Sequence, residues 1–251
     1  MGKPAFFGSL FLGLCIVAQA HELRAQSQSP SATAASYVDM GDKFARNREF
    51  KLAIGAYTVA LDYQPDFGLA YFRRGLARQE QGDLALAIAD FTKTVQIVPG
   101  CAEAFANRGY VYSLQQNVEK ALSDWQSALS LNPALTSVSY NRGNLRLNQG
   151  DFDAAVADFD RTLELDPDYA MAYNNRGIAK LGKGDVNGAI ADFTRATKLD
   201  PAHPEAFTNL GLIRLQQGNA VEAEKYFERS VKLKPSVKEF IDNRVTEIKQ
   251  Q

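Results

Sequence analysis

Small and apolar residues recur along the chain in one pattern that repeats every 34 residues. In each unit a glycine is followed twelve residues later by an alanine and, four residues further, by an aromatic residue. Spacings of three and four place side chains on one helix face, so each unit predicts two amphipathic helices. The glycines are Gly41, Gly75, Gly109, Gly143, Gly177 and Gly211, and the aromatics are Tyr57, Phe91, Trp125, Phe159, Phe193 and Phe227.

Turn-forming residues mark the expected helix ends. A Gly-Asp or Gly-Asn pair separates the two helices in four units, where glycine suits a left-handed helix end and the polar residue suits a helix cap. Arg48-Glu49 and Gln116-Asn117 occupy these places in the other two units. A proline closes each unit because the residue before proline avoids helical angles. These prolines are Pro65, Pro99, Pro133, Pro167, Pro201 and Pro235.

This spacing resembles the tetratricopeptide repeat (TPR) family, whose units pair two helices over 34 residues. The resemblance implies an all-α fold, a right-handed α-solenoid of six TPR helix pairs whose first helices line a concave groove. The expected units span residues 34–235, as 34–67, 68–101, 102–135, 136–169, 170–203 and 204–235.

A last amphipathic stripe follows the sixth unit. It consists of Val237, Phe240, Ile241, Val245 and Ile248. A terminal unit of a solenoid needs a cover for its apolar face, so residues 236–251 are expected to form a C-terminal capping helix.

The N-terminus has the pattern of a secretory signal. Lys3 precedes an apolar run from Ala5 to Ala18, and small residues then permit cleavage after Ala20. Residues 1–20 are therefore expected to be removed, which places the protein outside the cell or in the periplasm. An uncleaved membrane anchor is the alternative. Residues 21–33 are polar and are expected to form a flexible leader.

Composition excludes several functional classes. The formal net charge is −1, which argues against general nucleic-acid binding because that requires a basic stripe. The chain contains two histidines and lacks the motifs of phosphate loops, metalloproteases and serine hydrolases. We expect no enzymatic activity, no catalytic residues, no metal and no cofactor. Cys101 would be the single thiol after cleavage, and could bridge to another chain or have no role.

We call a position that recurs once in every 34-residue unit a column. Two such columns change together between charged and uncharged residues. Four units carry an arginine directly before the glycine, and the same four carry an aspartate directly before the second-helix aromatic. This covariation within one chain predicts structural ion pairs between the helices. The residues are Arg74, Arg108, Arg142 and Arg176 with Asp90, Asp124, Asp158 and Asp192.

A third column is rich in asparagine, at Asn107, Asn141, Asn175 and Asn209. An amide offers donors and an acceptor that match a peptide backbone. By resemblance to peptide-binding TPR arrays, these residues are expected to line a peptide groove. Local bonding or repeat consensus is the alternative explanation. Neighbouring groove candidates are Phe72, Tyr110, Tyr140 and Asn144, with Asn174 and Gln216 beside them.

The favoured function is an exported, non-enzymatic adaptor or scaffold that binds an extended segment of a partner protein in its concave groove. Two alternatives are a self-assembling structural TPR protein and a helper subunit of a cell-envelope enzyme complex. The expected partners are other proteins, with a homo-oligomer as one possibility. Neither nucleic acid nor stable membrane insertion after cleavage is expected.

Overall fold

The computed structural model describes residues 30–250, and within this range the chain forms helices and turns without a strand. The all-α prediction is confirmed. The first helices of the pairs are α2 (Pro30–Arg46), α4 (Gly68–Gln81), α6 (Ala102–Leu114), α8 (Thr136–Asn148), α10 (Ala170–Gly182) and α12 (Pro204–Gln216). The second helices are α3 (Phe50–Tyr63), α5 (Leu84–Ile97), α7 (Val118–Leu131), α9 (Phe152–Leu165), α11 (Val186–Leu199) and α13 (Ala220–Leu233).

Helix α2 begins at Pro30, inside the segment predicted as a flexible leader over residues 21–33. Ala34 is fully buried and anchors this first turn against the core, which explains why the helix starts earlier than expected. The signal peptide predicted over residues 1–20, its cleavage after Ala20 and residues 21–29 of the leader lie outside the described residues.

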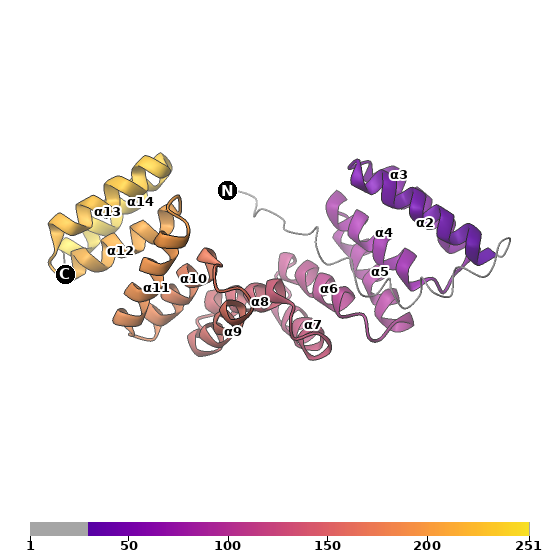
Figure 1. Ribbon diagram of the computed structural model, residues 1–251, viewed down its shortest axis with the longest axis horizontal. Helices are drawn as coiled ribbons and strands as arrows, with labels where there is room; N and C mark the ends of the chain where they lie inside the picture. The colour runs from indigo at the N-terminus through magenta and orange to yellow at the C-terminus, as the bar shows by residue number, and fades with distance from the viewer. Residues whose placement is uncertain (1–29, 251) are drawn as a thin grey trace. The chain divides into compact units, whose positions relative to one another are not determined.

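The chain divides into two compact units, unit 1 over Met1–Pro133 and unit 2 over Ala134–Gln251. Unit 1 contains α2 to α7 and unit 2 contains α8 to α14. In each unit the two helices of a pair pack side by side, and the second helix of a pair also packs on the first helix of the next (Figure 1). This is the packing of an α-solenoid, in which each repeat buries its apolar side against its neighbours.

Each helix pair closes where the second-helix aromatic lies on the first-helix glycine. A Cβ added to Gly143 would stand 2.8 Å from Cε1 of Phe159, whose side chain is fully buried. A larger residue there would overpack the contact, at a cost of about 1–3 kcal/mol. The same contact joins Gly41 to Tyr57, Gly75 to Phe91, Gly109 to Trp125, Gly177 to Phe193 and Gly211 to Phe227.

The turns inside the pairs share one backbone conformation. Gly82, Gly150, Gly184 and Gly218 have positive φ, as expected for a left-handed helix end. Arg48 and Gln116 adopt the same conformation, with φ of 62° and 59°. The fold thus imposes the left-handed turn even where the sequence lacks glycine.

Helix capping follows the sequence prediction at only some of the turns. The side chains of Asn117, Asp151 and Asp185 accept hydrogen bonds from backbone N–H groups three residues later. Asp83 and Asn219 stand at the same cap position without a side-chain cap bond, so the prediction is wrong there. Both side chains are exposed to solvent, while their main-chain carbonyls still accept the first helical hydrogen bond.

The C-terminal segment covers the last pair. A 3₁₀ turn, η2 (Pro235–Val237), leads into α14 (Lys238–Lys249), which contacts α12 (Figure 1). Ile241 is 4% exposed and packs with Phe227, so the helix shields an apolar side as expected. Phe240 is 53% exposed and does not belong to the buried stripe, which corrects the predicted set.

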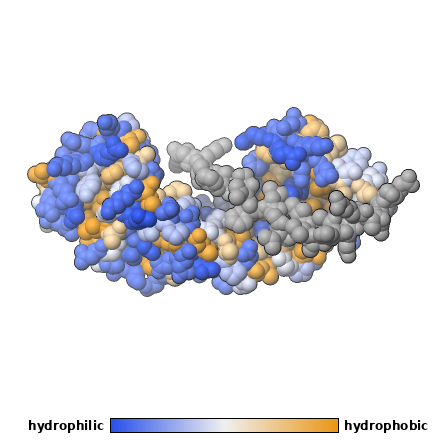
Figure 2. Space-filling model, in the orientation of Figure 1, coloured by the Kyte–Doolittle hydropathy of each residue, from blue (hydrophilic) through white to orange (hydrophobic). Residues whose placement is uncertain are grey.

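None of the helices between Pro30 and Gln250 combines the length and the apolar character that a membrane span requires. Figure 2 shows hydrophilic residues over most of the visible face of each unit, with hydrophobic residues in small separate patches. The apolar side chains are instead concentrated between the helices, where the aromatic of each pair is buried.

Replacing Gln116 by glycine should stabilise unit 1, because glycine adopts the left-handed conformation without the Cβ penalty. We expect a gain of about 0.5–1 kcal/mol after the entropic cost of glycine. Urea unfolding followed by the fluorescence of Trp125, the single tryptophan, measures this directly. Asn47→Gly, in the corresponding turn of the first repeat and at a position without positive φ, is the control, and a lower midpoint for Gln116→Gly would contradict the argument.

Candidate functional site

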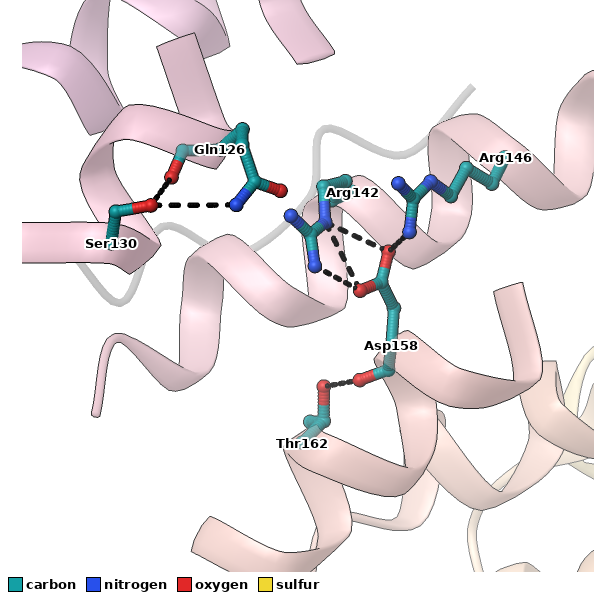
Figure 3. Close-up of polar contacts among 6 residues, drawn as sticks. All are labelled: Gln126, Ser130, Arg142, Arg146, Asp158 and Thr162. Carbon is teal, nitrogen blue, oxygen red and sulfur yellow. Dashed lines mark hydrogen bonds and ion pairs between the residues drawn. The ribbon is translucent and has the colours of Figure 1, made fainter. Parts of the chain in front are cut away.

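Four arginine–aspartate pairs join the two helices of a repeat, and Arg142 with Asp158 shows the geometry (Figure 3). Arg142 Nη2 lies 2.6 Å from Asp158 Oδ1, and its Nε donates to both carboxylate oxygens at 3.0 Å. Arg146 Nη1 adds a second cation at 2.9 Å from Oδ2. The Asp158 side chain is only 3% exposed, so its charge depends on these donors.

The pairs differ in the number of cations around the aspartate. A second cation, one turn after the arginine, reaches the carboxylate in three repeats: Arg78 on Asp90, Arg146 on Asp158 and Lys180 on Asp192. The third repeat has Tyr112 at this place, and Arg108 is the cation paired with Asp124, at 2.8 Å. That carboxylate hydrogen bond also raises the pKa of Arg108.

Three of the arginines, Arg74, Arg108 and Arg176, also reach the preceding repeat. Their guanidinium groups donate to a side chain on the previous second helix, so one residue ties its own pair together and links it to its neighbour. These contacts are Arg74 to Thr58 at 3.0 Å, Arg108 to Thr92 at 3.0 Å and Arg176 to Asp160 at 2.6 Å. The arginines are therefore part of the internal packing and do not form a ligand-binding row.

The four predicted ladder asparagines do not behave alike. Asn107 in unit 1 donates from Nδ2 to the carbonyl of Glu103 at 2.7 Å, one turn earlier in its own helix. Asn141 on α8 makes no side-chain hydrogen bond within residues 30–250. Asn175 and Asn209 bond to other repeats of unit 2. The local-bonding alternative therefore describes Asn107, and the remaining three belong to unit 2.

A continuous chain of side-chain hydrogen bonds runs across the first helices of unit 2. Asn209 Nδ2 on α12 donates to Asn174 Oδ1 at 3.1 Å, and Asn174 Nδ2 donates to Asn175 Oδ1 at 3.0 Å. Asn175 Nδ2 then donates to Asn144 Oδ1 at 2.7 Å and to the hydroxyl of Tyr140 at 3.1 Å, both on α8. We call these five residues, together with Asn141, the amide face.

Tyr140 is fixed by aromatic packing as well as by the asparagines. Its ring lies 4.8 Å from the ring of Tyr169 and 6.0 Å from that of Phe159. Burial raises the pKa of Tyr140, with the amide donors of Asn144 and Asn175 acting in the opposite direction. Burial likewise raises the pKa of Tyr169 to about 12, so both phenols are neutral near pH 7.

The groove candidates of unit 1 have different surroundings. Phe72 is half-buried, with its ring 5.9 Å from that of Phe91, so it contributes to the core. Tyr110 is half-buried. Its pKa is raised mainly by this burial and to a smaller extent by the Glu80 carboxylate. Arg73 stands in the asparagine column, with Nε 3.4 Å from Asp42.

Asp42 in turn accepts a 2.7 Å hydrogen bond from the buried hydroxyl of Tyr57. Burial and this carboxylate both raise the pKa of Tyr57. Sequence reading missed this cluster, although part of its signal was present: the second repeat carries Arg73 where the later ones carry asparagine.

The remaining candidates for metal binding or thiol chemistry have contacts of the kind found in a folded helical core. Among residues 30–250, no group of three or more His, Cys, Asp and Glu side chains is arranged to hold a metal ion. Cys101 is 3% exposed, with Sγ 3.8 Å from Glu103 Oε2, so a bridge to another chain would require local opening. His203 is 8% exposed and lies with Nδ1 3.3 Å from Glu205 Oε2.

The stacked helix pairs and their repeated contacts define a helical-repeat protein. Two family models described as tetratricopeptide repeat match the chain, one over residues 38–100 and 175–237 and the other over residues 137–169. The chain belongs to the tetratricopeptide repeat family. Arrays of this family are protein-interaction scaffolds, and their stacked repeats present extended binding surfaces.

Solved structures with the same fold include a crystal structure of MamA, 27% identical, which covers 67% of this chain and 92% of that one with a TM-score of 0.63. YrrB, described as a TPR protein with an unusual peptide-binding site, is 20% identical over 78% of this chain and 98% of its own, with a TM-score of 0.67. PilF of Pseudomonas aeruginosa is 17% identical over 82% and 94%, with a TM-score of 0.69. No curated protein sequence matches the chain.

The Arg108–Asp124 pair should show strong coupling in a double-mutant cycle. Arg108→Met leaves a buried carboxylate without its arginine and should cost about 3 kcal/mol in unfolding free energy. Adding Asp124→Leu removes the unpaired charge, so the double variant should be more stable than the sum of the single effects predicts. Trp125 lies beside Asp124 in the chain and reports unfolding by fluorescence.

Arg74→Met in the same unit is the matched control. It should cost less than Arg108→Met because Asp90 keeps its pair with Arg78 at 2.7 Å. Equal losses for the two arginine variants, or additive effects in the Arg108 cycle, would refute this account of the ion pairs.

Proposed function

We propose that the protein is an exported, non-enzymatic TPR scaffold that binds an extended segment of a partner protein on the amide face. The observation that supports this is the row of amide side chains carried by α8 and α10 and continued onto α12, in which Asn174 is buried and the others are partly exposed. Amide groups match the alternating N–H and C=O groups of an extended backbone.

The amide face keeps hydrogen-bonding capacity that its own contacts do not use. Asn141 contributes a complete amide, and Asn209 has a bonded Nδ2 with its Oδ1 opposite. Asn144 is bonded at Oδ1 to Asn175 and interacts through its amide with Tyr140. The five members of the hydrogen-bonded chain are neutral near pH 7. Such a surface favours backbone recognition over recognition of charged side chains.

Two features bear on the alternatives. Helix α14 covers the apolar side of the last pair in unit 2, which opposes end-to-end stacking through that side. A helper role in an envelope complex would use the same surface and is therefore a special case of the proposal. Export is supported by the basic, apolar and small-residue pattern of residues 1–20.

Asn141→Ala combined with Asn144→Ala should reduce partner capture. We expect the yield of specifically crosslinked proteins from the source envelope to fall several-fold, because two groups on one helix face lose their hydrogen bonds. The measurement is quantitative mass spectrometry after crosslinking and affinity isolation. Asn187→Ala, an exposed asparagine on α11, is the matched control. Equal recoveries for all three proteins would remove the amide face from partner binding.

The mature protein should begin at His21. Intact mass measurement of protein from the envelope fraction should show loss of residues 1–20, because small residues at Ala18 and Ala20 suit the peptidase. Ala20→Arg should block cleavage and leave the precursor, while Ala25→Arg, downstream of the site, should not. Recovery of full-length wild-type chain from a cytoplasmic fraction would reject the export proposal.

A further inference from the structure

Helix α3 in unit 1 is apolar on the side that faces solvent as well as on the sides that face protein. Two of its fourteen residues carry a charge, Lys51 and Asp62. The later second helices α9, α11 and α13 each carry three or more. A helix that is apolar all round is normally enclosed by protein. Within unit 1, α3 packs on α2 and α4, which leaves its outer side open to solvent.

The outer side of α3 carries a row of apolar residues. Leu52 and Tyr63 are 54% and 48% exposed, and Val59 between them is partly exposed. Spacings of seven and four residues keep the three side chains in line along the helix. Gly55 lies beside this row, and a Cβ added to it would meet no atom within 4 Å. We call Leu52, Gly55, Val59 and Tyr63 the α3 face.

Val59 departs from the pattern of its column. In the other five repeats this position of the second helix is polar, which suits a side that faces solvent. The residues are Lys93, Ser127, Arg161, Arg195 and Arg229. The TPR fold therefore does not require an apolar outer side, and the α3 face needs another explanation. Exposed apolar residues that are grouped in this way mark an interaction surface.

The two charges of α3 lie at the ends of this face and oppose the helix dipole. Lys51 is in the first turn, where the dipole favours an anion, and Asp62 is in the last turn, where it favours a cation. Within residues 30–250, neither side chain has a hydrogen-bond or ion-pair partner. Inside the chain these charges lower stability, and a contact with a second molecule would offset that loss.

An antiparallel copy of the same helix matches both the charges and the apolar row. Lys51 and Asp62 are eleven residues apart, about 16 Å along the helix. A two-fold axis halfway between them places each Lys51 opposite the Asp62 of the other copy. The same axis places each Leu52 level with the space between Val59 and Tyr63 of the other copy, as a knob enters a hole. A parallel copy would instead oppose like charges.

We infer that the α3 face is a self-association surface, on which a second copy of the chain packs its own α3 in antiparallel orientation. Both copies use the same residues, so the contact is isologous and closes as a dimer. Gly55 allows the two helices to approach closely. This inference goes beyond the proposed function, because the α3 face belongs to unit 1 and the amide face to unit 2.

Sedimentation equilibrium in reducing buffer measures the dimer, with protein purified from cells that express the complete chain. The wild type should dimerise reversibly as its concentration rises. Leu52→Glu removes an apolar contact from both copies and should raise the dimer Kd about a hundredfold. Val221→Glu is the matched control, since Val221 is 77% exposed on α13 and lies outside the α3 face. It should leave the Kd unchanged.

Charge exchange tests the antiparallel orientation. Lys51→Glu places like charges at both symmetric contacts and should raise the Kd about tenfold. Asp62→Lys should have the same effect. The double variant should recover the wild-type Kd, because unlike charges face each other again. An equimolar mixture of the two single variants should also form dimers, since each copy then supplies the charge that the other needs.

Folding stability separates a lost contact from a damaged fold. Lys51→Glu and Asp62→Lys both suit the helix dipole, so each should raise the unfolding temperature of the monomer. Gly55→Gln should also raise it, because glutamine favours the helix and the site has open space. All three variants should nevertheless dimerise less than wild type. Circular dichroism at a concentration where the wild type is monomeric provides this measurement, and a variant that only disturbs folding would lower both quantities.

The outcomes decide the inference directly. A wild type that stays monomeric at every concentration overturns it, even if the α3 face then binds a different protein or a lipid surface. A dimer that is insensitive to Leu52→Glu, or that the double charge variant fails to restore, overturns it as well. Loss in the single variants with recovery in the double variant and in the mixture supports it.

Discussion

The contact on which the structure depends is the one between a first-helix glycine and a second-helix aromatic. It allows the two backbones of a pair to approach so closely that a Cβ on Gly143 would stand 2.8 Å from Phe159. Because this contact recurs with the same spacing in every pair, the helices meet at equivalent heights. The other repeated contacts follow from this arrangement, since side chains at equivalent positions then face equivalent neighbours.

The ion pairs show how side chains at equivalent positions hold neighbouring repeats together. Arg108 bonds to Asp124 in its own pair and to Thr92 in the preceding one, so a single side chain connects three helices. A buried pair by itself contributes little net stability, because desolvation offsets attraction. Its value here is that a shifted helix would leave a charge buried and unpaired, which penalises alternative packings. The first and last repeats, with Met40 and Leu210 at this position, lack the arginine.

The fold could be predicted largely from sequence because each column of the repeat is determined by a local rule: helix periodicity, turn conformation or close packing. The candidate site could be predicted only in part. Asn107 and Asn175 occupy the same column, yet one bonds to its own helix and the other to α8. That difference depends on Tyr140, Asn144 and Asn174, which stand in other columns, so reading one column at a time could not reveal the network. The caps were likewise predicted only in part, since Asp151 and Asp185 cap their helices and Asp83 at the same position does not.

The proposed binding of a partner segment would gain from the bonds within the amide face, although these bonds use groups that a ligand could otherwise contact. An isolated asparagine on a helix samples several rotamers, and a ligand that orders it loses that entropy on binding. Tyr140 and Asn144 already have their orientations set by Asn175, so less ordering is needed when a ligand arrives. The network also joins α8, α10 and α12, so a segment bound over α8 contacts groups whose orientation depends on the next two repeats. Affinity at one repeat should therefore respond to substitutions two repeats away, which a row of independent asparagines would not produce.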